Sequence, residues 1–216
     1  MRLRILIADD HALLREGTRV VIDREPGWEI CGQASNGREA VEQAIALKPD
    51  IVILDMTMPE LNGLDAAVQI MRQVPGTEVA MLSAYGSEDL IRSAFGAGVK
   101  SFILKTEAED FLVDAVKSLA QHERFLTPRV SQILFSGLRD APTGGAELGP
   151  TQRLTTRERE VVQLLAEGKA NKEVAEKLQI SVRTAENHRA SILRKLGLDS
   201  VADLVRYAIR NQLIEP

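Results

Sequence analysis

The chain has 216 residues, a formal net charge of −4 and 27% charged residues. This composition suits one large domain or two modest ones and excludes a long disordered protein. A single cysteine, Cys31, excludes an internal disulfide and a cysteine-ligated zinc site, and it favours the cytoplasm as the compartment. No apolar stretch has the length of a signal peptide or a membrane span, so the sequence predicts no membrane partner.

Strand-like and helical patterns alternate over residues 4–119. Short apolar runs occur at residues 4–8, 28–34, 51–54, 79–82 and 102–104. A helical spacing of apolar residues follows each run, at residues 13–22, 38–47, a segment that ends near 74, 90–97 and 108–119. Strict alternation of this kind predicts an α/β fold with a doubly wound, five-stranded parallel sheet.

The remainder of the chain has a different composition and charge. Residues 1–150 carry a net charge of −7 and residues 151–216 a net charge of +3, which indicates that only the second part meets a polyanion. Residues 127–138 have helical spacing, and residues 139–153 have the glycine and proline content of a linker. Four short helices are then predicted, from Thr155 or Thr156 to 167, then at 171–178, 183–196 and 200–211. The second and third form a helix-turn-helix pattern.

Polar side chains follow the predicted strands of the first part. They are Asp9 and Asp10 after the first strand, Asp55 after the third, Ser83 after the fourth and Lys105 after the fifth. Because ligands of an open parallel sheet bind beyond the carboxyl ends of its strands, we expect these side chains to converge on one pocket. Taken singly, each aspartate reads as a turn or helix-cap residue; taken together, they favour a site.

Three carboxylates in one pocket repel one another, and a divalent cation with oxygen ligands relieves that cost. Mg²⁺ fits such a donor set, and Lys105 supplies a fixed positive charge. Together these groups suit the transfer of a phosphoryl group to a carboxylate. Asp55 is the predicted nucleophile because it ends the central strand and precedes a loop. The three histidines are scattered, so we interpret His11, His122 and His188 as surface or packing residues.

These residues resemble a known family. Asp9-Asp10, the segment from Asp55 to Pro59 with Gly63, Ser83-Ala84 and the segment from Phe102 to Lys105 are similar to the receiver domain of two-component response regulators. Residues 155–198 are similar to the LuxR-type helix-turn-helix of the NarL/FixJ branch. The resemblance implies a flavodoxin-like receiver domain at 1–122, a short helix and flexible linker at 123–153, and a DNA-binding domain at 154–216.

The resemblance also implies roles for single residues. Asp55 would accept a phosphoryl group from a sensor histidine kinase, and Mg²⁺ would be bound by Asp10 directly, by Asp9 through water, by Asp55 and by the Thr57 carbonyl. Ser83 and Lys105 would hold the phosphoryl oxygens, and Phe102 would turn inward when Ser83 moves. Thr106 follows Lys105 where many receivers have proline, so a cis bond is not expected there.

The third predicted helix of the second part is the candidate for the DNA major groove. Helical spacing from Ser181 places Arg183, Glu186 and Asn187 on one face, with Val182 toward the core. Glu186 and Asn187 are the predicted base contacts. The predicted phosphate contacts are Lys172, Thr184, Arg189, Arg194 and Lys195. The charge of +3 is modest, so a homodimer is expected to read double-stranded DNA, with Val201, Leu204, Val205 and Ala208 as its seam.

The leading hypothesis is therefore a transcription regulator controlled by phosphorylation, which is not an enzyme beyond slow self-dephosphorylation at Asp55. A phosphatase of the haloacid-dehalogenase type also uses a strand-end aspartate and Mg²⁺, but it needs an acidic residue where this chain has Thr57. A LuxR-type regulator that senses a small apolar molecule is a further alternative. The polar strand-end residues argue against it.

Overall fold

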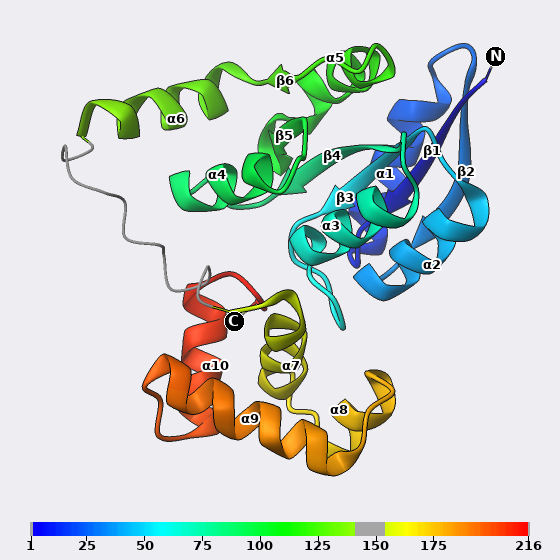
Figure 1. Ribbon diagram of the computed structural model, residues 1–216. Coiled ribbons are helices and arrows are strands. Elements are labelled where there is room, and N and C mark those ends of the chain that lie inside the picture. The colour runs from blue at the N-terminus through cyan, green and yellow to red at the C-terminus, as the bar shows by residue number, and fades with distance from the viewer. Residues whose placement is uncertain (1, 141–153, 216) are drawn as a thin grey trace. The chain divides into compact units, whose positions relative to one another are not determined.

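The structure is a computed structural model that describes residues 2–140 and 154–215, with the side chains of 2–136 and 154–215. The described residues form two compact units. The first unit holds strands β1–β6 and helices α1–α6, and the second holds helices α7–α10 (Figure 1). None of the described helices is long and apolar enough to cross a membrane.

A parallel sheet forms the centre of the first unit. Its strands are β1 (Leu3–Ala8), β2 (Trp28–Ala34), β3 (Ile51–Asp55), β4 (Glu78–Ser83), β5 (Ser101–Leu104) and β6 (Phe125–Leu126). They lie in the order β2-β1-β3-β4-β5-β6, and every neighbouring pair is parallel. All residues of β3 are buried, as expected for a central strand covered on both faces. The order reverses between β1 and β3, so the carboxyl ends of these two strands form the topological switch point.

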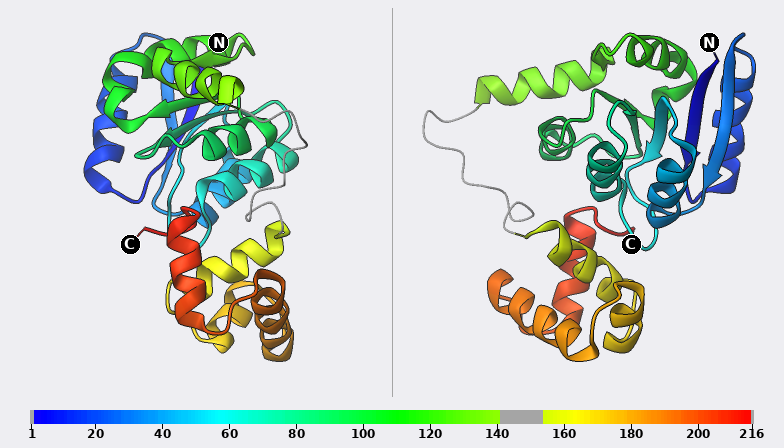
Figure 2. Two further views of the ribbon diagram at one scale, coloured as in Figure 1. Left: turned by 90° about the vertical axis from the view of Figure 1, so that its left-hand side faces the viewer. Right: turned by 45° about the vertical axis from the view of Figure 1, so that its right-hand side comes forward.

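Five helices cover the two faces of this sheet (Figure 2). They are α1 (Ala12–Asp23), α2 (Gly37–Leu47), α3 (Gly63–Gln73), α4 (Glu88–Gly96) and α5 (Ala108–Ala120). On one face, Ile22 of α1 and Leu112 of α5 share a buried cluster with β-strand isoleucines such as Ile53. Helices α2, α3 and α4 lie on the other face, where α2 and α3 pack together. The predicted α/β architecture is confirmed.

Side-chain caps set where the helices begin. The side chains of Asn36, Asn62 and Ser87 accept hydrogen bonds from backbone N–H groups in the first turns of α2, α3 and α4. Such a cap contributes about 1 kcal/mol and satisfies a donor that the helix itself leaves unpaired. The cap of α3 matters for function because it fixes the end of the loop that starts at Asp55.

A sixth strand, which the sequence analysis did not predict, and the helix predicted at 127–138 extend the first unit. Strand β6 adds two residues next to β5, pairing Phe125 with Ser101 and Leu126 with Phe102. Helix α6 (Pro128–Asp140) then packs against α4 and β5, with Val130 fully buried. Helix α6 runs beside α4 in Figure 1. The helix predicted at 127–138 therefore belongs to the first unit, whereas most of the predicted linker at 139–153 lies outside the described residues.

The second unit is a small helical domain. Its helices are α7 (Thr156–Ala166), α8 (Asn171–Lys177), α9 (Val182–Leu196) and α10 (Val201–Arg210), close to the four predicted. Thr155 and Glu158 form a reciprocal capping box at the start of α7, and Ser181 caps α9. Gly197 ends α9 in the left-handed conformation, with φ of 66°. Residues of all four helices share one buried core, which makes the unit a compact domain.

Candidate functional site

Three strand ends bring the predicted acidic residues together at the switch point of the sheet. Asp9 follows β1, Asp55 ends β3 and Lys105 follows β5. The Lys105 Nζ atom lies 2.8 Å from Asp55 Oδ2 and 3.1 Å from Asp9 Oδ2. The side chains of Asp9 and Asp55 are each 3% exposed, whereas that of Asp10 is 29% exposed. The predicted convergence of Asp9, Asp10, Asp55 and Lys105 is therefore present.

The cluster carries more negative than positive charge, so its carboxylates repel one another. Burial raises the pKa of Asp55 to about 7; the charge of Asp9 adds to the rise and that of Lys105 opposes it. Burial alone would lower the pKa of Lys105, but the charges of Asp55 and Asp9 outweigh it and the net shift is upward. Lys105 therefore stays charged while the carboxylates compete for it. The donor set of hard carboxylate oxygens around this imbalance fits a divalent cation.

His11 is a member of the site that the sequence interpretation missed. Its Nδ1 atom lies 2.9 Å from Asp10 Oδ1 and 3.7 Å from Asp9 Oδ1, and its side chain is 49% exposed. Its backbone N–H donates a hydrogen bond to Asp9 Oδ1 over 2.8 Å. His11 is exposed, in line with its interpretation as a surface or packing residue, but its place beside the acidic side chains was not predicted. Its position directly after Asp9-Asp10 was the signal that could have found it.

Ser83 lies at the end of β4, but its hydroxyl is turned to its own loop. The Ser83 Oγ atom donates a hydrogen bond to the Tyr85 carbonyl over 2.7 Å and accepts one from the Tyr85 N–H over 3.1 Å. Phe102 on β5 is fully buried, and Tyr85 is 46% exposed. The hydroxyl is thus held by the backbone of the β4–α4 loop.

The loop after Asp55 returns tightly to the strand that it leaves. The Gly63 N–H donates a hydrogen bond to the Met56 carbonyl over 2.7 Å. A Cβ atom on Gly63 would lie 1.9 Å from the Asp55 carbonyl oxygen, so no side chain fits there. Thr57, inside this loop, is 8% exposed. The glycine therefore allows the start of α3 to close the loop against the backbone of Asp55. The described residues contain no cis peptide bond, in line with Thr106 after Lys105.

Helix α9 presents the predicted DNA-contact residues to solvent. Exposed residues are Lys172 on α8 and Arg183, Glu186, Asn187 and Arg194 on α9, while Thr184 and Arg189 are partly exposed. Arg183, Asn187 and Arg194 recur at helical spacing, so they share a face. Ala185 and Ile192 point the other way and are buried. The turn between α8 and α9 contains Gln179 in the left-handed conformation, which permits the sharp change of direction.

One of the predictions for α9 needs correction, and a second residue of this helix has an ion-pair partner. Val182 was expected to face the core but is 43% exposed, because it is the first residue of α9. Lys195 Nζ lies 2.8 Å from a carboxylate oxygen of Glu158, the residue that closes the capping box of α7. Its side chain is 37% exposed, so this ion pair lies at the surface and the phosphate contact at Lys195 stays a prediction.

Only two of the four residues predicted to form the dimer seam on α10 are exposed to solvent. Leu204 and Ala208 are fully buried in the core of their own domain, where α10 packs against α7. They cannot meet a second copy while this core stays closed, so the prediction is wrong for these two residues. Val201 and Val205 are partly exposed and remain candidates for an interface. The amphipathic pattern of the helix did not say which apolar residues the domain itself uses.

Comparison with known proteins assigns both units. Residues 5–117 match the family described as "Response regulator receiver domain", and residues 152–208 match "Bacterial regulatory proteins, luxR family". The transcriptional regulatory protein LiaR of Bacillus subtilis (strain 168) is 34% identical over 212 residues, covering 98% of this chain and 99% of LiaR. The chain belongs to the NarL/FixJ, or LuxR-type, family of response regulators. The response regulator is therefore a DNA-binding transcription factor rather than a catalyst.

Two further proteins resemble this response regulator over nearly its whole length. The oxygen regulatory protein NreC of Staphylococcus carnosus (strain TM300) is 32% identical over 216 residues, 99% of this chain and 100% of NreC. RcsB from Salmonella enterica serovar Typhimurium, solved bound to promoter rprA in the presence of phosphomimetic BeF3−, has a TM-score of 0.58 at 23% identity. That likeness covers 95% of this chain and 98% of the RcsB chain and shows the shared fold.

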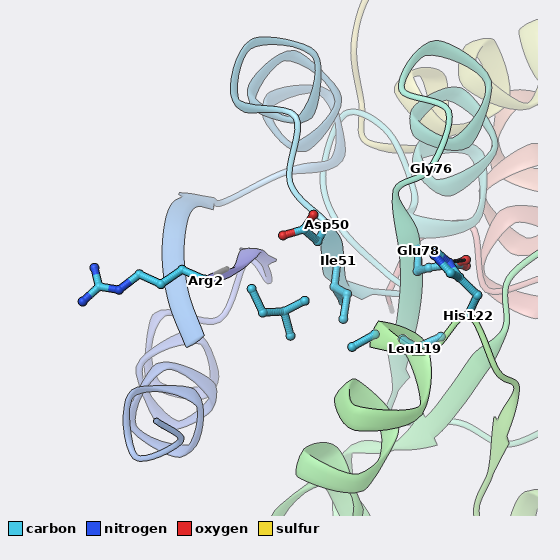
Figure 3. Close-up of a pocket in the computed structure, with 9 residues that line it drawn as sticks. Arg2, Asp50, Ile51, Gly76, Glu78, Leu119 and His122 are labelled. Atoms are coloured by element: carbon cyan, nitrogen blue, oxygen red, sulfur yellow. Dashed lines mark hydrogen bonds and ion pairs between the residues drawn. The ribbon is translucent and has the colours of Figure 1, made fainter. Parts of the chain in front are cut away.

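A separate cavity of about 290 Å³ lies at the opposite end of the sheet of this response regulator. It is lined where β1, β3 and β4 begin, by residues that include Arg2, Ile51 and Glu78 (Figure 3). Glu78 Oε1 is paired with Lys100 Nζ over 2.6 Å and with His122 Nδ1 over 2.8 Å. Its charge is already satisfied, and the cavity is remote from Asp55, so the chemistry belongs to the acidic cluster.

Proposed function

We propose that Asp55 accepts a phosphoryl group from a sensor histidine kinase and that this modification controls DNA binding by α9. The observation that carries the proposal is the cluster of Asp9, Asp10 and Asp55 around the Lys105 ammonium at the switch point. Asp55 is the acceptor because it lies at the centre of the sheet and its Oδ2 atom contacts Lys105. Lys105 would hold a phosphoryl oxygen after transfer.

We propose Mg²⁺ as the cofactor because of the acidic residues. Asp9, Asp10 and Asp55 place ligand atoms within 4.8 Å of one another, and their net charge exceeds what Lys105 neutralises. Mg²⁺ suits them, with Asp10 and Asp55 as direct ligands, Asp9 through water, and the Thr57 carbonyl as a further donor. When bound, Mg²⁺ neutralises charge that develops on the phosphoryl oxygens. Lys105 and the burial of Asp55 meanwhile orient the carboxylate and exclude bulk water.

The β4–α4 loop offers a path from Asp55 to α6. Ser83 is proposed to leave the Tyr85 backbone and bind a phosphoryl oxygen, which releases the loop. Gly86, in the same loop, is packed so closely that a Cβ there would lie 2.9 Å from Leu104 Cδ2 and 3.3 Å from Ile133 Cδ1. Ile133 is on α6. A shift of the loop would therefore move or repack α6, the helix that precedes the DNA-binding domain. Phe102, buried beside this loop on β5, is the residue proposed to repack with it.

Helix α9 is proposed to enter the major groove of double-stranded DNA. Glu186 and Asn187 would contact bases, and Arg183 would lie on the same DNA-facing side of the helix. The proposed phosphate contacts are Lys172, Thr184, Arg189, Arg194 and Lys195. Phosphorylation would favour a homodimer, with Val201 and Val205 at its seam, since one basic domain with few cations binds DNA weakly. Because its partner is DNA, the protein is proposed to work in the cytoplasm. The proposed functional division is 1–122 for the receiver, 123–153 for the connection and 154–216 for the DNA-binding domain.

The base contact is tested with Asn187→Ala. Asn187 is exposed on α9, so its loss leaves the core intact and removes a side chain that can pair with adenine. On a duplex selected from a random pool by the wild-type protein, affinity is expected to fall about 5- to 150-fold, and sequence preference at one position should relax. Electrophoretic mobility shift at fixed salt measures both. Asn211→Ala, the same change at the end of α10, is the control and should keep wild-type affinity. Equal losses in both variants would refute the placement of α9.

A further inference from the structure

The sequence contains two asparagine–glycine pairs, Asn36-Gly37 and Asn62-Gly63. Each asparagine is the N-cap residue of a helix, Asn36 of α2 and Asn62 of α3. An asparagine that precedes glycine is prone to deamidation, because glycine has no Cβ atom to keep its backbone nitrogen away from the asparagine side chain. The phosphoryl-transfer scheme above uses neither side-chain amide. Because the dipeptide is the same in both places, the fold determines which pair reacts.

Deamidation at such a pair needs only the chain itself and water. The glycine nitrogen gives up its proton and forms a bond to Cγ of the asparagine, while the bond from Cγ to the side-chain nitrogen breaks and ammonia leaves with the proton. Water then opens the resulting succinimide ring at either carbonyl. The products are aspartate, or isoaspartate with the side-chain methylene inserted into the backbone, and both carry a new negative charge.

Ring closure depends on how firmly the asparagine–glycine peptide is held. The backbone is extended at both asparagines, with ψ of 164° at Asn36 and 158° at Asn62. The peptide must therefore turn before the glycine nitrogen can face Cγ. A peptide that is hydrogen-bonded and packed on both sides resists this turn, whereas one in the first turn of a helix opens more easily because helix ends fray.

The pair Asn62-Gly63 is held on several sides. The Gly63 N–H donates to the Met56 carbonyl over 2.7 Å, which engages the nucleophile. The Asn62 side chain uses both of its ends, since Oδ1 accepts from the Asp65 N–H and Nδ2 donates to Asp65 Oδ2, each over 2.9 Å. Asn62 is 3% exposed, and Gly63 lies against the Asp55 carbonyl. Turning this peptide would dismantle the loop that begins at Asp55.

The pair Asn36-Gly37 is held less firmly. The Asn36 Oδ1 atom accepts one hydrogen bond, from the Glu39 N–H over 2.8 Å. The Gly37 N–H lies in the first turn of α2, where the helix offers it no partner, and it donates to no other group in the described part of the chain. The bonds from Ser35 to the Glu39 carboxylate hold the residue before the pair, not the pair itself. Asn36 is partly exposed and Ser35 is exposed, so water reaches this peptide although Gly37 itself is buried.

We infer that Asn36-Gly37 is a site of spontaneous deamidation in the folded protein and that the fold protects Asn62-Gly63. Aspartate at position 36 can still cap α2, and its charge is favourable at a helix N-terminus. Conversion there is therefore compatible with the folded first unit. At position 62 the same reaction would place a second carboxylate beside the buried carboxylate of Asp65. The inference does not depend on the function proposed above.

The test incubates the full-length wild-type protein in H₂¹⁸O at pH 8, both folded and in concentrated guanidinium chloride. Trypsin digestion in ordinary water and mass spectrometry follow. Arg38 lies between the two pairs, so trypsin places them on separate peptides, 25–38 and 39–72. Uptake of ¹⁸O marks deamidation during the incubation, and electron-transfer fragmentation distinguishes isoaspartate from aspartate. We expect Asn36 to react roughly tenfold or more faster than Asn62 in the folded protein, and the two to react within about threefold of each other in the unfolded chain.

The variant Asn36→Ser is the matched control, because serine keeps an N-cap oxygen but has no amide to lose. The ¹⁸O should disappear from peptide 25–38, whereas label that persists would place the reaction at Gln33 and overturn the inference. In the folded wild type, equal rates at Asn36 and Asn62 would also overturn it, whether both are fast or both are slow. That comparison decides the matter even where Asn36→Ser fails to fold.

Discussion

Asp55→Asn is expected to reduce covalent labelling by radioactive acetyl phosphate and Mg²⁺ to background. The amide that replaces the carboxylate cannot attack phosphorus, and no other carboxylate in the cluster has the same surroundings. Asp9 is also buried but is held by Lys105 at 3.1 Å and by the His11 N–H, and Asp10 is turned partly to solvent. Labelling is measured by gel electrophoresis under acidic conditions after short reaction times, before self-hydrolysis removes the phosphoryl group.

Asp110→Asn serves as the matched control for the labelling experiment. Asp110 is an exposed carboxylate in the first turn of α5, and its change removes the same charge from the same unit. It should label as the wild type does. Full labelling of Asp55→Asn, or a phosphorylated peptide that maps to Asp9 or Asp10, would show that the acceptor has been assigned to the wrong strand end.

The metal-free protein is expected to lose stability as pH rises toward 8, and Asp55 should account for much of the loss. A carboxyl whose pKa rises from 3.8 unfolded to about 7 folded binds its proton more tightly in the native state. Its contribution is therefore fully present below pH 3.8 and is lost as pH rises to about 7. The full loss is roughly 4 kcal/mol, and more than half of it falls between pH 5 and pH 8.

Urea unfolding of the wild type and Asp55→Asn at pH 5 and pH 8, with chelator, measures this difference. The variant has no carboxyl to titrate at this position, so its stability should fall less between the two pH values, by roughly 2 kcal/mol. Adding Mg²⁺ at pH 8 should restore the wild type more than the variant, because a ligand that binds only the native state stabilises it. Parallel pH profiles for the two proteins would contradict the strained electrostatics of the cluster.

The sequence predicted the parts of the site that depend on strand ends. Asp9, Asp55 and Lys105 each follow a strongly apolar strand, and a parallel sheet brings such ends to one edge whatever the details of packing. The direction of the Ser83 hydroxyl was not predictable in this way, since it depends on the loop that returns to Tyr85. Strand β6 was missed because two residues are too few for a periodic signal, and its pairing with β5 is set by tertiary contacts.

The DNA-binding unit shows a second limit of sequence patterns. Helical spacing identified α9 and its exposed face, but it could not tell which partly apolar residues the domain keeps for its own core. Leu204 and Ala208 fill that core, and Lys195 is paired with Glu158. Each of these assignments depends on a neighbouring helix. His11 was missed for a related reason: its partners come from the turn that carries Asp9 and Asp10, whereas scattered histidines in a sequence indicate no metal site.

The most direct test of the account measures DNA affinity and molecular mass with and without beryllium fluoride and Mg²⁺, which together mimic a phosphorylated aspartate. The probe is a duplex selected from a random pool by the treated protein. We expect treatment to raise affinity at least tenfold and to shift the protein from monomer to dimer, and we expect Asp55→Asn to show neither change. A dimer that binds the duplex equally well without treatment would contradict control by Asp55, even though both domains would remain as described.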